Sequence, residues 1–576
     1  MKKYIYSLMA FGLLIVAQSC NDYLEETNPN FLSSDTYWTD LNESESNLTS
    51  VYSAMLHQYV LGIEEEFLRT DIAFPGQRTR PTGIYLPWYQ QRVTSDLRAL
   101  SDRWDAKYQV IFRANQVIEG LNGMSEELKS DERWTRQMAE ARFFRGLMHF
   151  YLHSTFNNGS IIIRDAVPVT VQDFSKPLSS SEEVLAFFRE DLMYAFNNLP
   201  AQGIPVTRVD KAFAATILGT SHLYEGEYAQ AQVYFDDLIN NGEYGLQLEQ
   251  DVSKIFTNAG EFSVENIFEI NYADDKQPED GSFDEDSFQN RLARRTGPNG
   301  RNLEIRQTFG GQGWITPSAW LTYEYSTEPI DTQDPRNTVD GELRPISLRA
   351  AQSIAVVNDE ISPYYGYTAP QVFGFAGTRF SLFKKYTNHT VVTREFDTNT
   401  TPWESGRNVV VNRLGGVYLM YAECLTKTGD VSGAIATLNE LRKRWGLQLL
   451  GMSDGSAHDF DGVAYDETSL MDHLMYKEYP LELAMEGFST RFINLRRWGI
   501  TQQRFQELST RVFSLANYTY TRTNGNTANR NRSLVQEGSG PNEFTEYLEA
   551  AAAWAANDLG YFPLPQSETL NNQNVN

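Results

Sequence analysis

Cysteine, basic residues and long apolar runs are scarce in this 576-residue chain, and each shortage excludes a class of protein. Two cysteines, Cys20 and Cys424, cannot build a disulfide framework or a four-ligand zinc site. The 49 Lys and Arg residues are outnumbered by 75 Asp and Glu, and the formal net charge is −26. Such a surface repels phosphate, so we expect no nucleic acid partner. A Walker motif is also missing from the sequence.

What is present is an ordinary globular balance with many aromatic residues. Apolar residues make up 41% of the chain and charged residues 22%, which argues against disorder. The 31 Tyr, 33 Phe and 10 Trp residues often stand in stretches rich in glycine and proline rather than in periodic helices. These aromatic stretches are candidates for loops that bind a ligand.

The first 20 residues have the pattern of an export signal. Lys2 and Lys3 precede an apolar stretch from Leu8 to Ala17, whose ten residues are about half of what a membrane-spanning helix needs. The stretch ends in Ala17-Gln18-Ser19-Cys20, which resembles a bacterial lipobox. We therefore predict a signal peptide over 1–19 and a lipid on Cys20, which would anchor the protein to a membrane without spanning it. The alternative is an ordinary signal peptide with a chance cysteine.

Helix pairs are predicted for most of the remaining chain. Apolar residues recur every three or four positions in 101–121, 132–156, 182–198, 209–241, 408–445 and 468–498. Two regions share the same offsets, in which a turn glycine is followed by alanine at +5 and by larger apolar residues at +9 and +12. They are Gly226, Ala231, Phe235 and Leu238, and Gly429, Ala434, Leu438 and Leu441. This spacing is typical of tetratricopeptide-like repeats, in which stacked helix pairs bury a shared core.

Irregular inserts interrupt this helical scaffold. We expect the scaffold to cover about 40–242 and 408–500, and the loop-rich inserts to cover about 60–98, 243–407 and 511–546. Short strand-like runs occur at Ile161-Ile162-Ile163 and Val409-Val410-Val411. An insert as long as 243–407 is usually functional. The predicted fold is mainly α, with loops presented by helices.

The chain resembles the SusD/RagB outer-membrane nutrient-binding lipoproteins over nearly its whole length. The motifs that carry the resemblance occur in the family's order. They are Asp22-Tyr23-Leu24, Ala141-Arg142-Phe143-Phe144, Val167-Pro168-Val169, Gly226-Glu227-Tyr228, Asp334-Pro335-Arg336, Leu419-Met420-Tyr421-Ala422-Glu423, Glu482-Leu483-Ala484-Met485-Glu486-Gly487, Arg497-Trp498-Gly499 and Pro563-Leu564-Pro565.

The resemblance implies one SusD-like domain over 20–576, with four tetratricopeptide-like helix pairs supporting a ligand face. It also implies a lid on a SusC-type TonB-dependent transporter barrel that captures oligosaccharide or polysaccharide, at the cell exterior of the outer membrane. No catalysis and no cofactor are implied. The alternatives are a peptide-binding RagB-like protein of the same family and, as a third hypothesis, an uncharacterised enzyme or a non-catalytic helical-repeat scaffold.

Sugar binding requires aromatic platforms beside polar groups, and the stretch 71–92 has this composition. Trp88 is the first candidate for a stacking platform, although Pro87 could instead wedge it under a loop. The other candidates of this stretch are Asp71, Arg80, Tyr85 and Tyr89. Asp71 and Arg80 could instead pair with each other.

Three further candidates lie elsewhere in the chain. Asp40 and Asn42 open the first predicted helix, where an N-cap and a solvated neighbour are the simpler interpretation. Arg379 follows the aromatic loop 363–367, which is a second possible platform. Since the aromatic stretch 71–92 has few basic residues, we expect a neutral plant glycan or fructan as the ligand.

Metal binding is not predicted. His149 and His153 are four residues apart on a helix, but no third ligand is evident. The acidic run 274–286 lacks the ordered spacing of a calcium loop, so a solvated loop is favoured.

Overall fold

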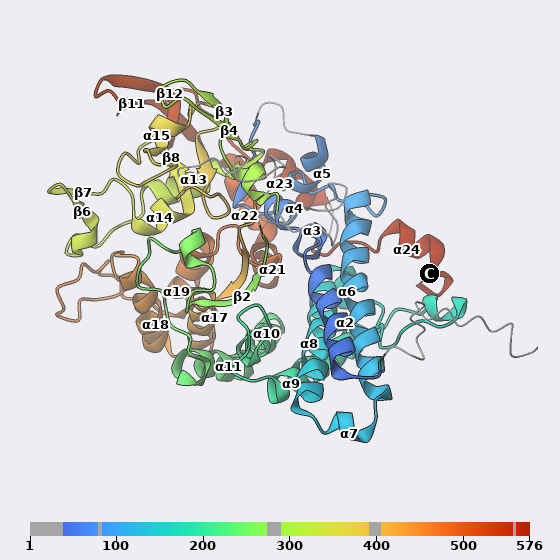
Figure 1. Cartoon of the computed structure of the whole chain (residues 1–576). Coiled ribbons are helices and arrows are strands. Elements are labelled where there is room, and N and C mark those ends of the chain that lie inside the picture. Colours follow the sequence, from blue (N-terminus) through green and yellow to red (C-terminus); the bar gives the residue numbers. More distant parts are fainter. Residues whose placement is uncertain (1–37, 79–82, 274–289, 391–404, 557–559, 576) are drawn as a thin grey trace, which may run out of the picture.

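Helices form most of the regular structure in the computed structural model, which describes residues 38–78, 83–273, 290–390, 405–556 and 560–575 (Figure 1). The longer helices are α2 (Leu41–Ala54), α6 (Arg98–Gly123), α8 (Glu132–Thr155), α9 (Ser181–Asn198), α10 (Lys211–Tyr224), α11 (Tyr228–Asn240), α13 (Ala319–Ser326), α17 (Leu414–Lys427), α18 (Val431–Arg444), α21 (Thr490–Arg497), α22 (Thr501–Thr510) and α23 (Leu548–Ala556). The shorter ones are α3 (Gln58–Leu61), α4 (Ile63–Leu68), α5 (Leu86–Tyr89), α7 (Glu126–Lys129), α12 (Leu292–Thr296), α14 (Leu348–Ser353), α15 (Ala369–Val372), α19 (Glu467–His473), α20 (Tyr479–Glu482) and α24 (Gln566–Asn571).

Most strands are short apart from β11 and β12, and in the described ranges they pair two by two in antiparallel fashion. The pairs are β1 (Ala73–Pro75) with β5 (Ile315–Pro317), β2 (Asn266–Ile270) with β10 (Val409–Arg413), β3 (Asn299–Asn302) with β4 (Gln307–Gly310), β6 (Thr338–Val339) with β7 (Glu342–Leu343), β8 (Ile354–Val356) with β9 (Ser381–Phe383), and β11 (Phe513–Thr521) with β12 (Thr527–Glu537).

Four helix pairs form the scaffold within the described ranges: α2 with α6, α8 with α9, α10 with α11, and α17 with α18. Neighbouring pairs also pack against one another, α6 on α8, α9 on α10 and α11 on α17. Figure 1 shows them running from the blue helices to the orange ones across the lower part of the molecule. The mainly α prediction with four tetratricopeptide-like pairs is confirmed.

The predicted repeat has the expected physical basis. Gly226 and Gly429 lie in the turns of their helix pairs with φ of 75° and 91°, a left-handed backbone that favours glycine. Ala231 and Ala434 are completely buried, so each allows its two helices to approach closely. Cys424 is buried in α17, as expected for a small apolar residue there.

One of the two predicted strands is confirmed and the other is wrong. Val409 to Val411 belong to β10, which pairs with β2. Residues Ile161 to Ile163 lie outside any strand, although Ile161 and Ile162 are buried. Their carbonyls accept hydrogen bonds from a loop N–H of Ser179, at 2.8 Å, and from the Tyr108 hydroxyl, at 2.7 Å. Burial therefore explains the apolar run, and a loop and a side chain replace the strand partner.

A buried ionic cluster ties the last helix pair to the rest of the scaffold. Arg413, at the end of β10, bonds Glu265 at 2.8 Å, Glu482 at 2.8 Å and Glu486 at 2.6 Å. Arg349, Arg442 and Arg444 bond further glutamates in the same region, among them Glu478. Each of these side chains is buried, so each charge requires its partners to offset the loss of water.

The loop-rich part of the chain forms the upper region of Figure 1, where β3, β4, β8, β11, β12, α13 and α15 gather. The pair β1 and β5 connects this region to the N-terminal part of the chain. Ser318, which follows β5, donates its hydroxyl to the carbonyl of Asp71, which precedes β1, at 2.7 Å. In the described part of the chain, every helix is too short or too polar to cross a membrane.

Candidate functional site

A cleft of about 730 Å³ opens on the loop-rich face. Its lining residues come from the stretch with β1 and α5, from the turn 376–379, from the β11–β12 hairpin and from the segment 542–549. Its lining residues are Phe74, Arg78, Tyr89, Ala376, Gly377, Thr378, Leu515, Asn531, Arg532, Asn542, Glu543, Phe544, Thr545, Glu546, Tyr547, Leu548 and Glu549. A volume of this size is within the usual range for small-molecule sites, about 300–1,000 Å³.

Aromatic rings form much of the cleft wall. The Phe74 ring centroid lies 5.4 Å from that of Tyr89 and 5.5 Å from that of Tyr547. These three rings are buried, whereas Phe544 is half-buried. Phe544 is therefore the lining ring best placed to offer a face to a ligand.

Arg78 and Glu546 hold two walls together. Arg78 Nε lies 2.8 Å from Glu546 Oε1, and its Nη2 donates to the Pro317 carbonyl at 2.7 Å. Glu546 Oε2 in turn accepts the N–H of Ala319 at the start of α13, at 2.8 Å. Both side chains are nearly enclosed and have partners in the protein, so the pair holds the cleft wall in place and is not available to a ligand.

A bulge in β12 directs Arg532 toward the cleft. Ala516 pairs with Leu534 and Tyr518 with Arg530, so three residues of β12 oppose the single residue Asn517. Asn517 Oδ1 accepts the Arg532 N–H at 2.9 Å, and Arg532 has a φ of 52°. Such bulges change the direction in which a side chain points, often beside functional sites.

Left-handed backbone recurs in the cleft wall, at Asn542 with φ 58° and Tyr547 with φ 66°. Side chains rarely adopt this conformation, and it concentrates at binding and catalytic sites. Three polar lining side chains are also free. Neither Asn531, nor the Arg532 guanidinium, nor Glu549 has a side-chain hydrogen bond or ion pair within the described ranges. The cleft thus combines an aromatic face with exposed polar groups that have no side-chain partner in the described part of the protein.

The structure contradicts three of the predicted ligand residues. Trp88 is 1% exposed, lies edge-on to Phe562 and has the Arg103 guanidinium 4.8 Å from its ring, so neither ring face can stack on a sugar. Tyr85 is also 1% exposed, and its hydroxyl donates to Glu64 at 2.7 Å. Trp88 is therefore a buried packing residue of α5 and not a ligand platform.

Asp71 is the third. It is completely buried between Arg491, at 2.7 Å, and Arg504, at 2.8 Å. Burial alone would raise its pKa, but the two guanidinium groups outweigh burial and lower the pKa of Asp71 to about 2. The Asp71 carboxylate therefore joins the turn between α4 and β1 to α21 and α22, and a ligand cannot reach it.

The other predicted residues have different outcomes. Asp40 caps α2 through a capping box with Glu43, as in the simpler interpretation, and neither Asp40 nor Asn42 lines the cleft. Tyr89 lines the cleft, and Arg379 adjoins the lining residue Thr378, so their roles in binding stay predictions. Arg80 and Cys20 lie outside the described residues.

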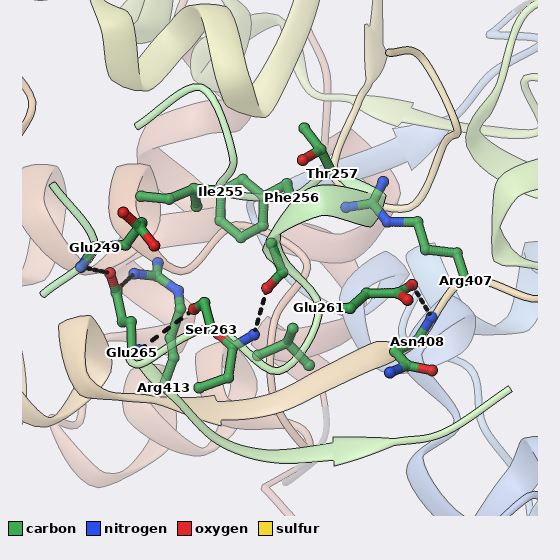
Figure 2. A pocket seen from close by; sticks show the side chains of 13 residues that line it. Glu249, Ile255, Phe256, Thr257, Glu261, Ser263, Glu265, Arg407, Asn408 and Arg413 are labelled. Atoms are coloured by element: carbon green, nitrogen blue, oxygen red, sulfur yellow. Dashed lines mark hydrogen bonds and ion pairs between the residues drawn. The ribbon is translucent and has the colours of Figure 1, made fainter. Parts of the chain in front are cut away.

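Two other cavities are less suited to a ligand. Figure 2 shows a small one, with Glu249, Glu265 and Arg413 at one end and Arg407 at the other. Its volume of about 20 Å³ leaves room for about one water molecule. A larger cavity of about 520 Å³ lies between α13, α18 and the Lys477 region, but its charged groups largely pair among themselves.

Sequence reasoning missed the cleft residues of 515–549, of which Arg532 and Phe544 are the most prominent. A signal was present, since 513–536 contains three arginines and no Asp or Glu in a chain with 75 acidic residues. Phe544 has no comparable local signal, because its exposure depends on how 540–549 packs against β11.

Helix pairs that present an irregular face with an aromatic and polar cleft define a binding protein built on a repeat scaffold. The model of the SusD family matches residues 264–576, more than half of the chain, and a second model, described as "Starch-binding associating with outer membrane", matches 22–223. The chain belongs to the SusD family.

Individual relatives cover most of the chain at low identity. SusD-like protein P25 of Formosa agariphila is 22% identical over an alignment of 540 residues that covers 88% of this chain and 93% of the relative. A SusD superfamily protein of Bacteroides vulgatus has a TM-score of 0.68 at 19% identity, over 94% of this chain and 99% of that one. A laminarin-binding SusD-like protein has a TM-score of 0.62 at 20% identity, over 81% and 94% of the two chains. These structures share the fold.

Proposed function

We propose that this protein binds oligosaccharide or polysaccharide in the 730 Å³ cleft and acts without catalysis. The observation that carries the proposal is the meeting of Phe544 with free amide, guanidinium and carboxylate side chains in one cleft. Sugars offer C–H-rich faces for aromatic rings and hydroxyls for polar groups, and the cleft supplies both kinds of contact.

The family supports the same class of ligand. One matching family model is described as starch-binding, and a solved structure with the same fold is a laminarin-binding protein. Both are carbohydrates, whereas the peptide-binding alternative has no comparable support among these similarities.

The proposal includes a place in the cell. A lipid on Cys20 would hold the protein on the outer membrane, facing the exterior, where it would act as the lid of a SusC-type TonB-dependent transporter and deliver its glycan for import. The description of the second family model, which includes association with the outer membrane, supports this location.

Affinity electrophoresis through gels cast with different polysaccharides tests the binding proposal. We expect Phe544→Leu to weaken retardation by the bound polysaccharide several-fold, since an aromatic contact contributes about 0.5–1.5 kcal/mol beyond its area. Phe174→Leu is the matched control, because Phe174 is 60% exposed and does not line the cleft.

Equal retardation of the Phe544 variant and the control would remove the cleft from the binding site. Binding of a peptide library, with no retardation by any polysaccharide, would replace the proposal with the peptide-binding alternative. Loss of membrane association in Cys20→Ala is the expected result for the lipid anchor, and unchanged association would contradict it.

A further inference from the structure

We infer that the glycan carries negative charge, and that Arg379 and Arg532 bind its carboxylate or sulfate groups at the wall of the cleft. This inference rests on the proposed function and names the substrate class of the same site. It departs from the expectation of a neutral plant glycan, which considered only the stretch 71–92.

The charge of the chain is distributed unevenly around the cleft. The chain as a whole has a formal charge of −26, yet 513–536 contains Arg522, Arg530 and Arg532 and no acidic residue. The β3–β4 hairpin adds Arg301 and Arg306 against the single acid Glu304. Two neighbouring hairpins are thus locally positive in a strongly acidic protein.

The two hairpins are in direct contact, so their charges act together. Glu304 accepts the Tyr520 hydroxyl at 3.2 Å and the N–H of Thr523 at 2.8 Å, which joins the β3–β4 hairpin to the β11–β12 hairpin. Figure 1 shows β3 and β4 beside β12 at the top of the molecule. Arg301, Arg306 and Arg522 are exposed around this junction, and none has an ion pair within the described residues.

Arg379 and Arg532 carry this positive region to the cleft. A Cβ atom placed on Gly377 would lie 3.8 Å from Cβ and Cδ of Arg532, so the Arg532 side chain lies over the turn 376–379 that lines the cleft. Arg379, on the same turn, donates from Nη1 to Asn299 Oδ1 of β3 at 2.9 Å.

Both guanidinium groups lack a carboxylate partner within the described ranges. Arg379 Nε is buried without a hydrogen bond partner, and Arg532 is exposed. Most buried arginines of the described residues contact a glutamate or aspartate, whereas Arg379 on the turn and Arg532 of β12, which lies over the turn, have none. A planar guanidinium is well suited to bind a carboxylate or sulfate through two hydrogen bonds.

The segment 542–549 gives the ligand an orientation, because two of its exposed polar side chains are acidic. Glu543 and Glu549 are exposed on the segment 542–549, where they would repel an anionic substituent but accept hydrogen bonds from sugar hydroxyls. The anionic group is therefore placed against the turn 376–379 and β12, and the hydroxyl-rich edge against 542–549. Glu546, a third acid of this segment, is already paired with Arg78.

Paired polysaccharides that differ only in charge test the inference. The carboxylate arm compares polygalacturonate with its methyl ester, and the sulfate arm compares a fucan sulfate with its desulfated form, each by affinity electrophoresis. We expect retardation by an anionic form and little by its neutral partner, and the arm that responds identifies the group. Higher salt should weaken this binding.

Substitutions locate the contact. Arg379→Gln with Arg532→Gln should weaken binding roughly tenfold for each guanidinium lost, because hydrogen bonds to charged groups are among the stronger ones. Arg98→Gln with Arg133→Gln is the control with the same change of charge, since both are solvent-exposed side chains on the first helix pairs. Arg532→Gln alone, an exposed position, serves if the double variant does not fold.

Stronger retardation by the neutral forms would overturn the inference and leave the proposed function standing. Equal weakening in the test and control variants would also overturn it, because the anionic polymer would then bind by net charge alone. Failure of every charged and neutral polysaccharide to bind would contradict both the inference and the proposed function.

Discussion

Two sets of arginines in this protein have opposite surroundings. Arg349, Arg413, Arg442 and Arg444 are buried in the scaffold and each contacts at least one glutamate. Arg301, Arg306, Arg522 and Arg532 are exposed on the two hairpins, and in the described part of the chain none contacts an acid. The residue type is the same, and only the folded surroundings differ.

The difference separates structural charge from charge available to a ligand. A buried arginine needs its glutamates to offset desolvation, so the core set is committed to the fold. An exposed arginine incurs no such cost and remains free to exchange water for an anion. This chain has 26 more acidic than basic residues, so an arginine that lacks an acidic partner indicates a position available to a ligand.

The largest expected effect comes from breaking the core set. Arg413→Met leaves Glu265, Glu482 and Glu486 short of a buried partner, and removing one partner of a buried ion pair costs about 3–5 kcal/mol. Equilibrium unfolding in urea measures the loss. Arg301→Gln on the β3–β4 hairpin is the control, and an equal loss in both variants would abolish the distinction between the two sets.

Trp88→Ala tests whether a buried aromatic residue also serves the fold and not the ligand. Because Trp88 is buried against Phe562, we expect a loss of about 3–5 kcal/mol in the free energy of unfolding. Glycan affinity of the folded fraction should not change. Lost retardation in a variant with wild-type stability would return Trp88 to the binding site.

Acid should weaken the scaffold through its paired carboxylates. Burial opposes ionisation of Asp71 and Glu482, but neighbouring arginines prevail and lower the pKa of each to about 2, from ordinary values of 3.8 and 4.5. A lowered pKa in the folded state stabilises the protein above the ordinary pKa, and this stability is lost as the pH falls from about 4.5 toward 2.

The loss should be on the order of 2–3 kcal/mol for each carboxylate. Urea unfolding at pH 7, 4.5 and 3 measures it. Asp71→Asn should be less stable at pH 7 and lose less on acidification. The same pH dependence in this variant as in the wild-type protein would show that Asp71 does not contribute.

The smallest expected effect on stability is that of replacing an exposed arginine. Arg532→Gln should change the free energy of unfolding by less than about 0.5 kcal/mol, because the side chain is exposed and without an ion pair within the described residues. Thermal melting beside wild-type protein measures it. A large loss would show that Arg532 supports the bulge instead of being available to a ligand.

The scaffold could be predicted from the sequence because its signals are local. Gly226 and Ala231 are five residues apart, and the turn and the close helix contact they allow depend only on that short segment. Asp71 and Trp88 were misassigned because their partners are distant in sequence. Arg491 lies 420 residues after Asp71, and no spacing along the chain indicates that the two meet.

The cleft was hard to predict for the same reason, since it is built from segments that are distant in sequence. Its walls come from four separate segments, and Phe544 becomes a lining ring only when 540–549 pairs with β11. Composition alone points to Tyr89, which lines the cleft, and to Arg379, which adjoins it, and their roles in binding stay predictions. The positive charge of the two hairpins could also be recognised in the sequence, but only by comparison with the acidic composition of the whole chain.

The ionic cluster around Arg413 also has a consequence for the order of folding. Glu265 and Arg413 are 148 residues apart, and Glu482 follows 69 residues later, so the cluster cannot close until the chain beyond Glu486 has been made. The pairs from α2 to α11 depend mainly on nearby residues and can form earlier. We expect a folding intermediate with ordered N-terminal helix pairs, in which the future core arginines are still hydrated.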